Sequence, residues 1–253
     1  MILDLTFEQR SLTMATLSSL AYNDNQEFKD LGYDSKFISH GGSEVYVLWD
    51  NDDLIVVCRG TQPTHFNDIA HDIEFALVPS RSGHGLVHHG FRTSVDLIWI
   101  ELLKMLQKYG INRRVWCTGH SLGAAMATLI TARCARTDKL SKPLLYTYGS
   151  PRVGDMAFIK HMNSLNIEHH RWVNNADAVT RNPIYPYKHH GQLHYFDHHG
   201  NVRIFTRWQT IKDRVKGFYI GLKKGKINFF VNHDIGNYIK NLGKLIDLST
   251  GHD

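Results

Sequence analysis

The chain is poor in cysteine and has no long apolar run. Its 253 residues include three cysteines, Cys58, Cys117 and Cys134, an odd number without motif spacing. This excludes a disulfide framework of the kind that holds small secreted domains, and we expect reduced, buried thiols in an intracellular protein. No stretch approaches the roughly 18 consecutive apolar residues that a membrane-spanning helix needs.

The N-terminal stretch also lacks the features of a secretory signal peptide. MILDLTFEQR has no basic start before an apolar core, and it carries an acid at Asp4. We therefore expect a cytoplasmic protein, or one exported by a route that does not use a signal peptide.

Positive charge is concentrated in one segment. Residues 207 to 226 include seven basic residues and one acidic residue, so the net charge of this segment is 7 − 1 = +6, compared with +5 for the whole chain. The remainder is nearly neutral, so the composition excludes a nucleic-acid-binding surface spread over the fold. Aromatic residues among the bases, such as Trp208 and Phe218, suit peripheral contact with an anionic lipid surface, whereas a solvated connector is the alternative. No obligate protein partner is evident.

Short apolar strands alternate with helices along the chain. The expected strands are 44–50, 54–58, 114–118, 144–148, 171–175, 194–196 and 202–205, and the expected helices are 7–21, 94–110, 122–136, 155–165 and one beginning near 234. This alternation predicts an α/β fold with a mostly parallel sheet covered on both faces. Without a repeat or a linker, we expect a single domain over residues 1–253.

The pentapeptide Gly-His-Ser-Leu-Gly at 119–123 lies where a predicted strand ends and a predicted helix begins. This is the setting of a nucleophile elbow, in which flanking side chains would collide unless both are glycine. Ser121 is therefore the predicted nucleophile. The alternative is a glycine turn in which Ser121 only caps the helix.

A serine nucleophile needs a base, and the base needs an acid that orients it. Asp177 follows the predicted strand 171–175 and is the expected acid, with Asp155 as the second candidate. His233 stands directly before the last amphipathic helix and is the expected base. The other candidates for the base are His189, His190, His194, His198 and His199.

The tetrahedral intermediate of acyl transfer needs hydrogen-bond donors. The backbone N–H of Leu122 follows the nucleophile, and Thr61, after the strand 54–58, is the expected second donor. His189, Asp197 and His199 lie in a histidine-rich stretch, but nothing in their spacing defines a four-ligand metal site, so we expect no metal and no cofactor.

Several motifs together resemble the class 3 lipases, the fungal-lipase type of α/β-hydrolase. They are RGT at 59–61, VHHGF at 87–91, GHSLGAA at 119–125, YGSPRVG at 148–154, VNNADAVTR at 173–181, YKHHG at 187–191 and NHDIGNYI at 232–239. The resemblance covers roughly residues 10 to 245. It implies the same roles for Ser121, Asp177, His233, Thr61 and Leu122, and hydrolysis of carboxylic esters, commonly acylglycerols or phospholipids, without a cofactor.

The segment 62–75 occupies the position of the lid in this family. Phe66, Ile69 and Ile73 share one helical face, which would cover the serine and turn toward lipid, although a permanently packed helix would show the same pattern. The sequence departs from the family pattern at Ile69, where Trp is usual, at Asp155, where Asn is usual, and at Asn232, where Asp is common.

Together these features predict a serine carboxylester hydrolase, a lipase acting on acylglycerol esters through an acyl-enzyme on Ser121. The alternatives are a phospholipase or feruloyl-type esterase that uses the same site, and a catalytically idle scaffold of hydrolase fold.

Overall fold

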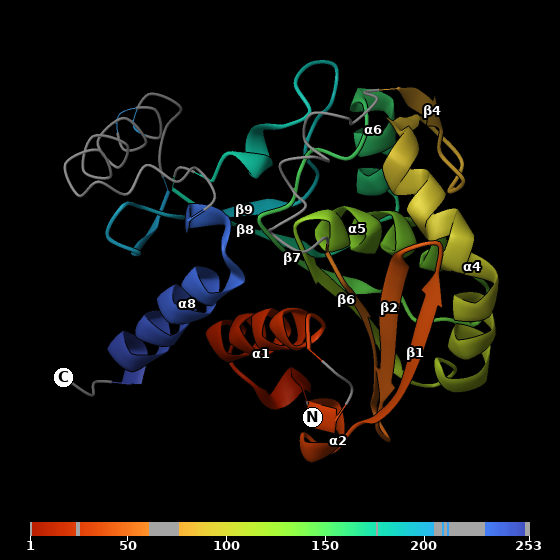
Figure 1. Cartoon of the computed structure of the whole chain (residues 1–253), viewed down its shortest axis with the longest axis horizontal. Helices are drawn as coiled ribbons and strands as arrows, with labels where there is room; N and C mark the ends of the chain where they lie inside the picture. The colour runs from red at the N-terminus through yellow and green to blue at the C-terminus, as the bar shows by residue number, and fades with distance from the viewer. Residues whose placement is uncertain are drawn as a thin grey trace.

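The computed structural model describes residues 2–23, 26–60, 76–175, 177–204, 209, 212 and 231–250. Within these residues one eight-stranded sheet has the order β1-β2-β3-β6-β7-β8-β9-β10, and two further strands form a separate hairpin (Figure 1). The strands are β1 (Asp34–His40), β2 (Ser43–Trp49), β3 (Asp53–Cys58), β4 (Leu77–Pro79), β5 (Leu86–His88), β6 (Arg114–His120), β7 (Leu144–Tyr148), β8 (His169–Asn174), β9 (Gln192–Phe196) and β10 (Val202–Arg203). The helices are η1 (Ile2–Asp4), α1 (Phe7–Leu20), α2 (Gln26–Asp30), α4 (His89–Tyr109), α5 (Leu122–Cys134), α6 (Met156–Ser164), η2 (Val179–Arg181), η3 (Val231–His233) and α8 (Ile235–Thr250).

The middle of the sheet is parallel. β3 pairs with β6, β6 with β7, β7 with β8 and β8 with β9 in parallel, while β1–β2, β2–β3 and β9–β10 are antiparallel. The predicted mostly parallel sheet is confirmed. Because parallel strands end at the same edge, the residues that follow β3, β6, β7 and β8 lie along one edge of the sheet.

Helices cover both faces of the sheet, as Figure 1 shows: α4, α5 and α6 lie on one face, and α1 and α8 on the other. β3 shows how coverage of both faces affects the amino-acid sequence of a strand. Its residues Leu54 and Val56 belong to the first core and Ile55 and Val57 to the second, and all are fully buried. A strand buried on both faces reads as a continuous apolar run, which is why LIVVC does not alternate with polar residues.

Local signals set several element boundaries as predicted. The N–H of Gln9 donates to Thr6 Oγ1 at 3.2 Å, and the N–H of Thr6 donates to Gln9 Oε1 at 3.0 Å, a capping box at the start of α1. In the turn between β2 and β3, the Asp50 carboxylate accepts the N–H groups of Asp52 and Asp53. The two strands expected at 44–50 and 54–58 are thus joined by this turn and pair antiparallel.

Other boundaries differ from the prediction. α4 begins at His89, five residues before the predicted start at 94, because the His88 ring accepts the N–H of Phe91 and caps the helix there. β1 was not predicted, since it is a polar outer strand in which only Ile38 is buried. The β4–β5 hairpin was also missed, because each of its strands has three residues.

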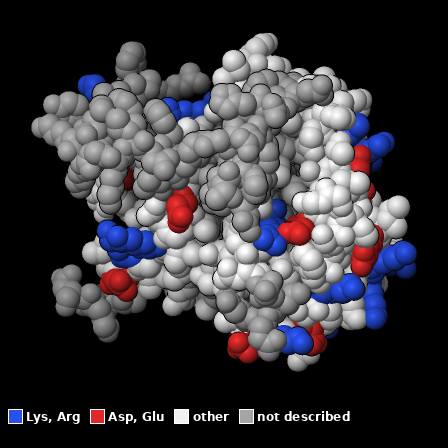
Figure 2. All heavy atoms as spheres, in the orientation of Figure 1, with Lys and Arg blue, Asp and Glu red and all other residues white. Residues whose placement is uncertain are grey.

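The predicted lid 62–75, Thr61 and most of the basic segment 207–226 lie outside the described residues. Among the described helices, none is long and apolar enough to cross a membrane. Figure 2 shows acidic and basic side chains interspersed over the described surface of the face in view.

Candidate active site

Ser121 occupies a strained turn between β6 and α5. Its φ of 59° and ψ of −127° are rare for any residue except glycine. Its N–H donates to the carbonyl oxygen of Tyr148 at 3.0 Å, which ties the turn to the end of β7. The side chain does not cap α5, and the buried Oγ has no hydrogen-bond partner among the described residues. The alternative interpretation, in which Ser121 only caps the helix, is therefore wrong.

The two flanking glycines leave no room for a side chain. A Cβ atom on Gly119 would lie 2.5 Å from the carbonyl carbon and oxygen of Gly123, so the predicted collision across the turn is confirmed. A Cβ on Gly123 would overlap the carbonyl oxygen of Cys58 on β3, a contact that the sequence did not reveal. The turn thus holds the start of α5 directly against the neighbouring strand.

Asp177 and His233 form a buried hydrogen-bonded pair. Asp177 follows β8 and has no exposed surface, and His233 ends η3 and is 6% exposed. His233 Nδ1 donates to Asp177 Oδ2 at 2.9 Å. Because the proton is on Nδ1, neutral His233 carries its lone pair on Nε2, which is the tautomer that a general base requires.

The neighbours of Ser121 contact this pair from two sides. His120, the preceding residue, donates from Nε2 to the backbone oxygen of His233 at 2.6 Å, and the two rings are 4.5 Å apart. Gly149 follows Tyr148, the acceptor for the Ser121 N–H; a Cβ on Gly149 would lie 2.9 Å from both Asp177 Oδ2 and the His233 ring. The serine, the carboxylate and the imidazole therefore meet at the edge where β6, β7 and β8 end.

Tyr238 on α8 is a residue of this site that sequence reasoning missed. Its hydroxyl donates to Asp177 Oδ2 at 2.6 Å and accepts the N–H of Asn174 at 3.1 Å. Burial, and then the Asp177 charge, raise the pKa of Tyr238 well above its ordinary value, so it stays a proton donor. The N–H of Val179 supplies a further hydrogen bond, to Asp177 Oδ1. Three hydrogen bonds thus compensate the burial of the Asp177 carboxylate.

His120 was also missed, although it lies inside the pentapeptide. Burial, and then the neighbouring His233, lower its pKa well below the ordinary value, so the ring is neutral. Because Nε2 donates to His233, Nδ1 must accept, and the Tyr22 hydroxyl donates to it at 3.0 Å. This chain of contacts joins the end of α1 to the loop that carries the base.

The predicted oxyanion donors can be located only in part. Leu122 is the first residue of α5, and the first N–H groups of a helix have no intrahelical partner. Thr61 is outside the described residues, but the preceding Gly60 lies against the elbow, since a Cβ on it would be 2.6 Å from the His120 carbonyl oxygen.

The alternative acid and bases occupy other places. Asp155 caps α6 by accepting the N–H of Phe158 at 2.8 Å, and it also accepts the N–H of Leu86. His190 pairs with His169, and His194 pairs with His170, each at 3.0 Å between ring nitrogens. His198 and His199 lie in the turn between β9 and β10, and their ring centroids are 3.9 Å apart.

The histidine-rich stretch does not assemble the metal ligands considered from sequence. His189 donates to the carbonyl oxygen of Thr180, and Asp197 accepts from the backbone of His199 and Asn201. In the described part of the chain, no group of three or more His, Cys, Asp or Glu side chains is placed to hold a metal ion.

The chain is similar to several known proteins in sequence and in structure. The family model for lipase (class 3) matches residues 55–186, more than half of the chain. The chain is 32% identical to the toxin TseL of Vibrio cholerae over 56% of its length, 37% identical to the lipase of Rhizomucor miehei over 51%, and 31% identical to the chloroplastic phospholipase A(1) DAD1 of Arabidopsis thaliana over 67%. The aligned parts span 28%, 37% and 39% of these three relatives.

The solved structure of Rhizomucor miehei triacylglyceride lipase superposes with a TM-score of 0.65 at 26% identity, covering 76% of this chain and 81% of that one. The sheet, its two helical layers and the elbow thus define an α/β-hydrolase fold, as predicted. Within that class, the chain belongs to the class 3 lipase family.

Proposed function

We propose that this protein is a serine carboxylester hydrolase that cleaves acylglycerol lipids, with Ser121 as nucleophile, His233 as base and Asp177 as orienting acid. The observation that carries the proposal is the buried 2.9 Å hydrogen bond between Asp177 and His233, beside a serine held in a strained turn. The membership in the class 3 lipases and the likeness to the Rhizomucor miehei lipase support it.

In this mechanism Ser121 Oγ attacks the ester carbonyl carbon while its proton passes to His233 Nε2. The oxyanion that forms is stabilised by the N–H of Leu122 and by Thr61, as in other serine hydrolases. Collapse of the tetrahedral intermediate breaks the bond to the alcohol, which leaves with the proton from His233. Water then attacks the acyl-enzyme, again giving its proton to His233, and the fatty acid is released from Ser121.

The geometry argues against a catalytically idle scaffold. Asp177 and His233 are both buried, and burying such a pair costs free energy unless every polar atom is compensated. The Ser121 turn adds backbone strain of about 1–3 kcal/mol. A binding scaffold gains nothing from either feature, whereas acyl transfer requires both.

The test is labelling with a fluorophosphonate together with hydrolysis of p-nitrophenyl butyrate. We expect stoichiometric labelling of the wild type at Ser121 and none of Ser121→Ala. His233→Ala should lose on the order of 10⁴-fold or more in kcat, because nucleophile and base act as one unit. Near-normal turnover by His233→Ala, together with loss in His198→Ala or His199→Ala, would show that the base is misassigned.

Phospholipid hydrolysis is the second candidate, because the similarity to DAD1, a phospholipase A(1), covers 67% of this chain. Release of fatty acid from diolein, phosphatidylcholine and methyl ferulate separates the three substrate classes. We expect diolein to be cleaved fastest; a higher kcat/KM on phosphatidylcholine or on methyl ferulate would replace the acylglycerol proposal.

A further inference from the structure

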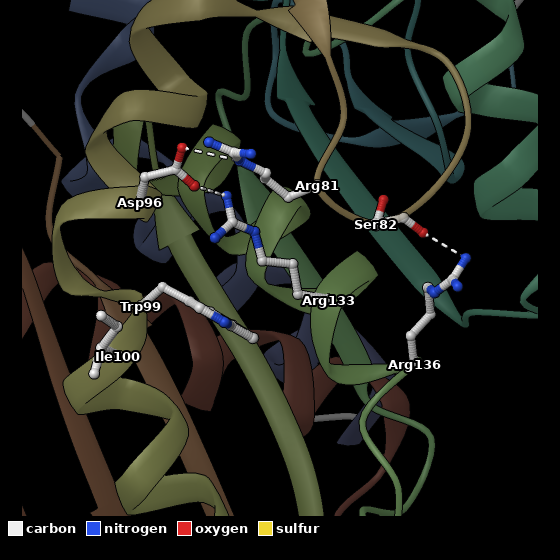
Figure 3. Close-up of a pocket in the computed structure, with 7 residues that line it drawn as sticks. All are labelled: Arg81, Ser82, Asp96, Trp99, Ile100, Arg133 and Arg136. Atoms are coloured by element: carbon white, nitrogen blue, oxygen red, sulfur yellow. Dashed lines mark hydrogen bonds and ion pairs between the residues drawn. The ribbon is translucent and has the colours of Figure 1, made fainter.

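A second site lies on the α4–α5 face of the sheet. A cavity of about 400 Å³ opens between these helices and the loop that joins β4 to β5 (Figure 3). The cavity is lined by Arg81 and Ser82 from the loop and by Asp96 and Trp99 from α4. Arg133, near the end of α5, and Arg136, just after it, also line the cavity. None of these residues belongs to the candidate active site.

The lining carries more positive than negative charge. Figure 3 shows the guanidinium groups of Arg81 and Arg133 converging on the Asp96 carboxylate, with distances of 3.4 and 2.5 Å. Arg92, one turn before Asp96 on α4, pairs with the same carboxylate at 3.6 Å. The Asp96 carboxylate is therefore shared by three arginines and is the single acidic partner of each among the described residues.

The remaining arginine has no acidic partner in the described part of the chain. Arg136 donates to the backbone oxygen of Ser82 at 2.9 Å, a neutral acceptor. The three arginines that line the cavity and the adjacent Arg92, against one carboxylate, leave an excess of 4 − 1 = 3 positive charges at and beside the cavity. Each guanidinium has five N–H donors, so most of the donors are left without a protein acceptor.

Burial makes the positive charge of Arg133 costly without an anion. The Arg133 side chain is 7% exposed, and its guanidinium lies 5.0 Å from the centre of the Trp99 ring. Burial lowers the pKa of Arg133, Asp96 opposes this effect, and the charges of Arg81 and Arg92 lower it further. An incoming anion would relieve the repulsion between the arginines and restore the hydrogen bonds that burial removes.

We propose that this cavity binds a phosphate group. Arginine forks donate paired hydrogen bonds to phosphate oxygens, and guanidinium groups from three segments can contact different oxygens of one phosphate. The two charges of a phosphate monoester neutralise two of the three excess charges, which a single carboxylate cannot do. Bound phosphate would tie the β4–β5 loop to both helices. The group comes either from a soluble phosphate ester or from the headgroup of an anionic lipid.

The test begins with titration of the full chain with inorganic phosphate at constant ionic strength, followed by calorimetry and by tryptophan fluorescence. We expect saturable binding with a change in the emission of Trp99, which Trp99→Phe removes. Arg81→Gln and Arg136→Gln should each weaken binding by about ten-fold or more, and Arg81→Lys by less. All variants are compared by circular dichroism to establish that they fold.

Arg203→Gln is the matched control. Arg203 is 55% exposed and pairs with one carboxylate at 3.2 Å, much as Arg81 is 60% exposed and pairs at 3.4 Å. Arg203→Gln changes the net charge of the protein by the same amount as Arg81→Gln, but it should leave phosphate binding unaltered. An equal loss in Arg203→Gln would show non-specific charge attraction and overturn the proposal, as would unchanged binding in Arg81→Gln and Arg136→Gln.

Two further titrations identify the source of the phosphate. Glycerol 3-phosphate should compete with inorganic phosphate if the ligand is soluble. Tighter binding to phosphatidylcholine vesicles that contain phosphatidate, lost in Arg81→Gln, would identify a lipid headgroup instead. Failure of inorganic phosphate, glycerol 3-phosphate and these vesicles to bind would overturn the proposal. The site lies apart from Ser121, so this result and the esterase assays are independent.

Discussion

Asp177 receives hydrogen bonds from three separate segments. Val179 follows it in the chain, His233 lies on the loop before α8, and Tyr238 lies on α8 itself. Each donor stabilises the carboxylate, and together they hold its position without help from solvent. The orientation of the base therefore depends on Tyr238 as well as on the carboxylate.

Replacement of Tyr238 tests this dependence. Tyr238→Phe keeps the ring, which packs in the core, but removes the hydroxyl that donates to Asp177 at 2.6 Å. Since a hydrogen bond to a charged group contributes about 1.5–3 kcal/mol, we expect kcat to fall by roughly 10- to 100-fold with little change in KM.

The control is Tyr109→Phe, at the end of α4, where the ring stacks on Trp49 at 4.2 Å. It should leave ester hydrolysis unchanged. Activity of Tyr238→Phe within two-fold of wild type, at equal stability, would remove Tyr238 from the positioning of the site.

Sequence reasoning nominated some residues of the site and missed others for a physical reason. Ser121, Asp177 and His233 carry chemistry in a recognisable order along the chain. Tyr238 falls at an apolar position of an amphipathic helix, where an aromatic ring is expected in the core, and its hydroxyl acquires a partner only through tertiary packing. The contacts of His120 could not be predicted for the same reason, because its partners Tyr22 and His233 lie about 100 residues away on either side.

At the level of elements, the glycines divide into two kinds. Gly123 lies where α5 meets β3, and a Cβ there would overlap the Cys58 carbonyl oxygen, a backbone atom that cannot move aside. Gly243 lies on α8 with open space around it. The same substitution should therefore have opposite effects at the two positions.

We expect Gly243→Ala to stabilise the protein by about 0.5–1 kcal/mol, because alanine is the better helix former. Gly123→Ala should destabilise it by several kcal/mol, as severe backbone overlap does. Urea unfolding followed by circular dichroism measures both. If Gly123→Ala unfolds at the wild-type urea concentration, the close contact between α5 and β3 is not present in solution.

Two histidine pairs pack against β8, through its adjacent residues His169 and His170. His169 pairs with His190 and His170 with His194. Burial lowers the pKa of His190 and of His194 to about 4, and that of His169 well below its ordinary value. In the unfolded chain these rings take up protons near pH 6.5.

The free energy of unfolding should therefore decrease as the pH falls from about 6.5 towards 4, because the unfolded state binds more protons in that range. Below about 4 His190 and His194 become charged in the folded state as well, and their contribution levels off. Urea midpoints between pH 7 and pH 4 measure the slope. His190→Gln should flatten it, while His84→Gln, at an exposed position on the β4–β5 loop, should not; equal slopes in all three proteins would contradict the assignment.

The predictability of the elements follows from their burial. β3, β6 and β7 are buried on both faces and are visible as apolar runs. In contrast, β1 has a polar sequence and depends on its pairing with β2 and on its contacts with α4. The start of α4 depends on a histidine cap, which is not among the usual capping residues. Such positions are determined by tertiary contacts, so the sequence pattern alone could not place them.

Considered as a whole, the molecule exposes apolar side chains beside its candidate site. Ile184 and Tyr185 are 69% and 82% exposed, on the loop that follows η2, and η2 begins two residues after Asp177. We expect these two side chains to contact lipid when substrate is presented at a surface.

We expect Ile184→Ser with Tyr185→Ser to lower hydrolysis of emulsified triolein by at least about five-fold, because burial of their apolar surface contributes roughly 25 cal/mol per Å². Hydrolysis of soluble p-nitrophenyl butyrate should be unchanged. Phe66→Ser should reduce the rise in rate that accompanies the appearance of an emulsion. The control is Leu248→Ser near the end of α8, which is 68% exposed and should affect neither substrate. Equal losses on both substrates would indicate damage to the site instead of a lost surface contact.

The contact between His120 and His233 joins residues 113 positions apart, and it has a consequence for biosynthesis. During translation, Ser121 and its strained turn are made early, Asp177 next, and the segment that carries His233 and Tyr238 last. A nascent chain that has folded through β9 thus contains Ser121 and Asp177 but not His233, the proposed base. We therefore expect ester hydrolysis to begin only after α8 docks against α1.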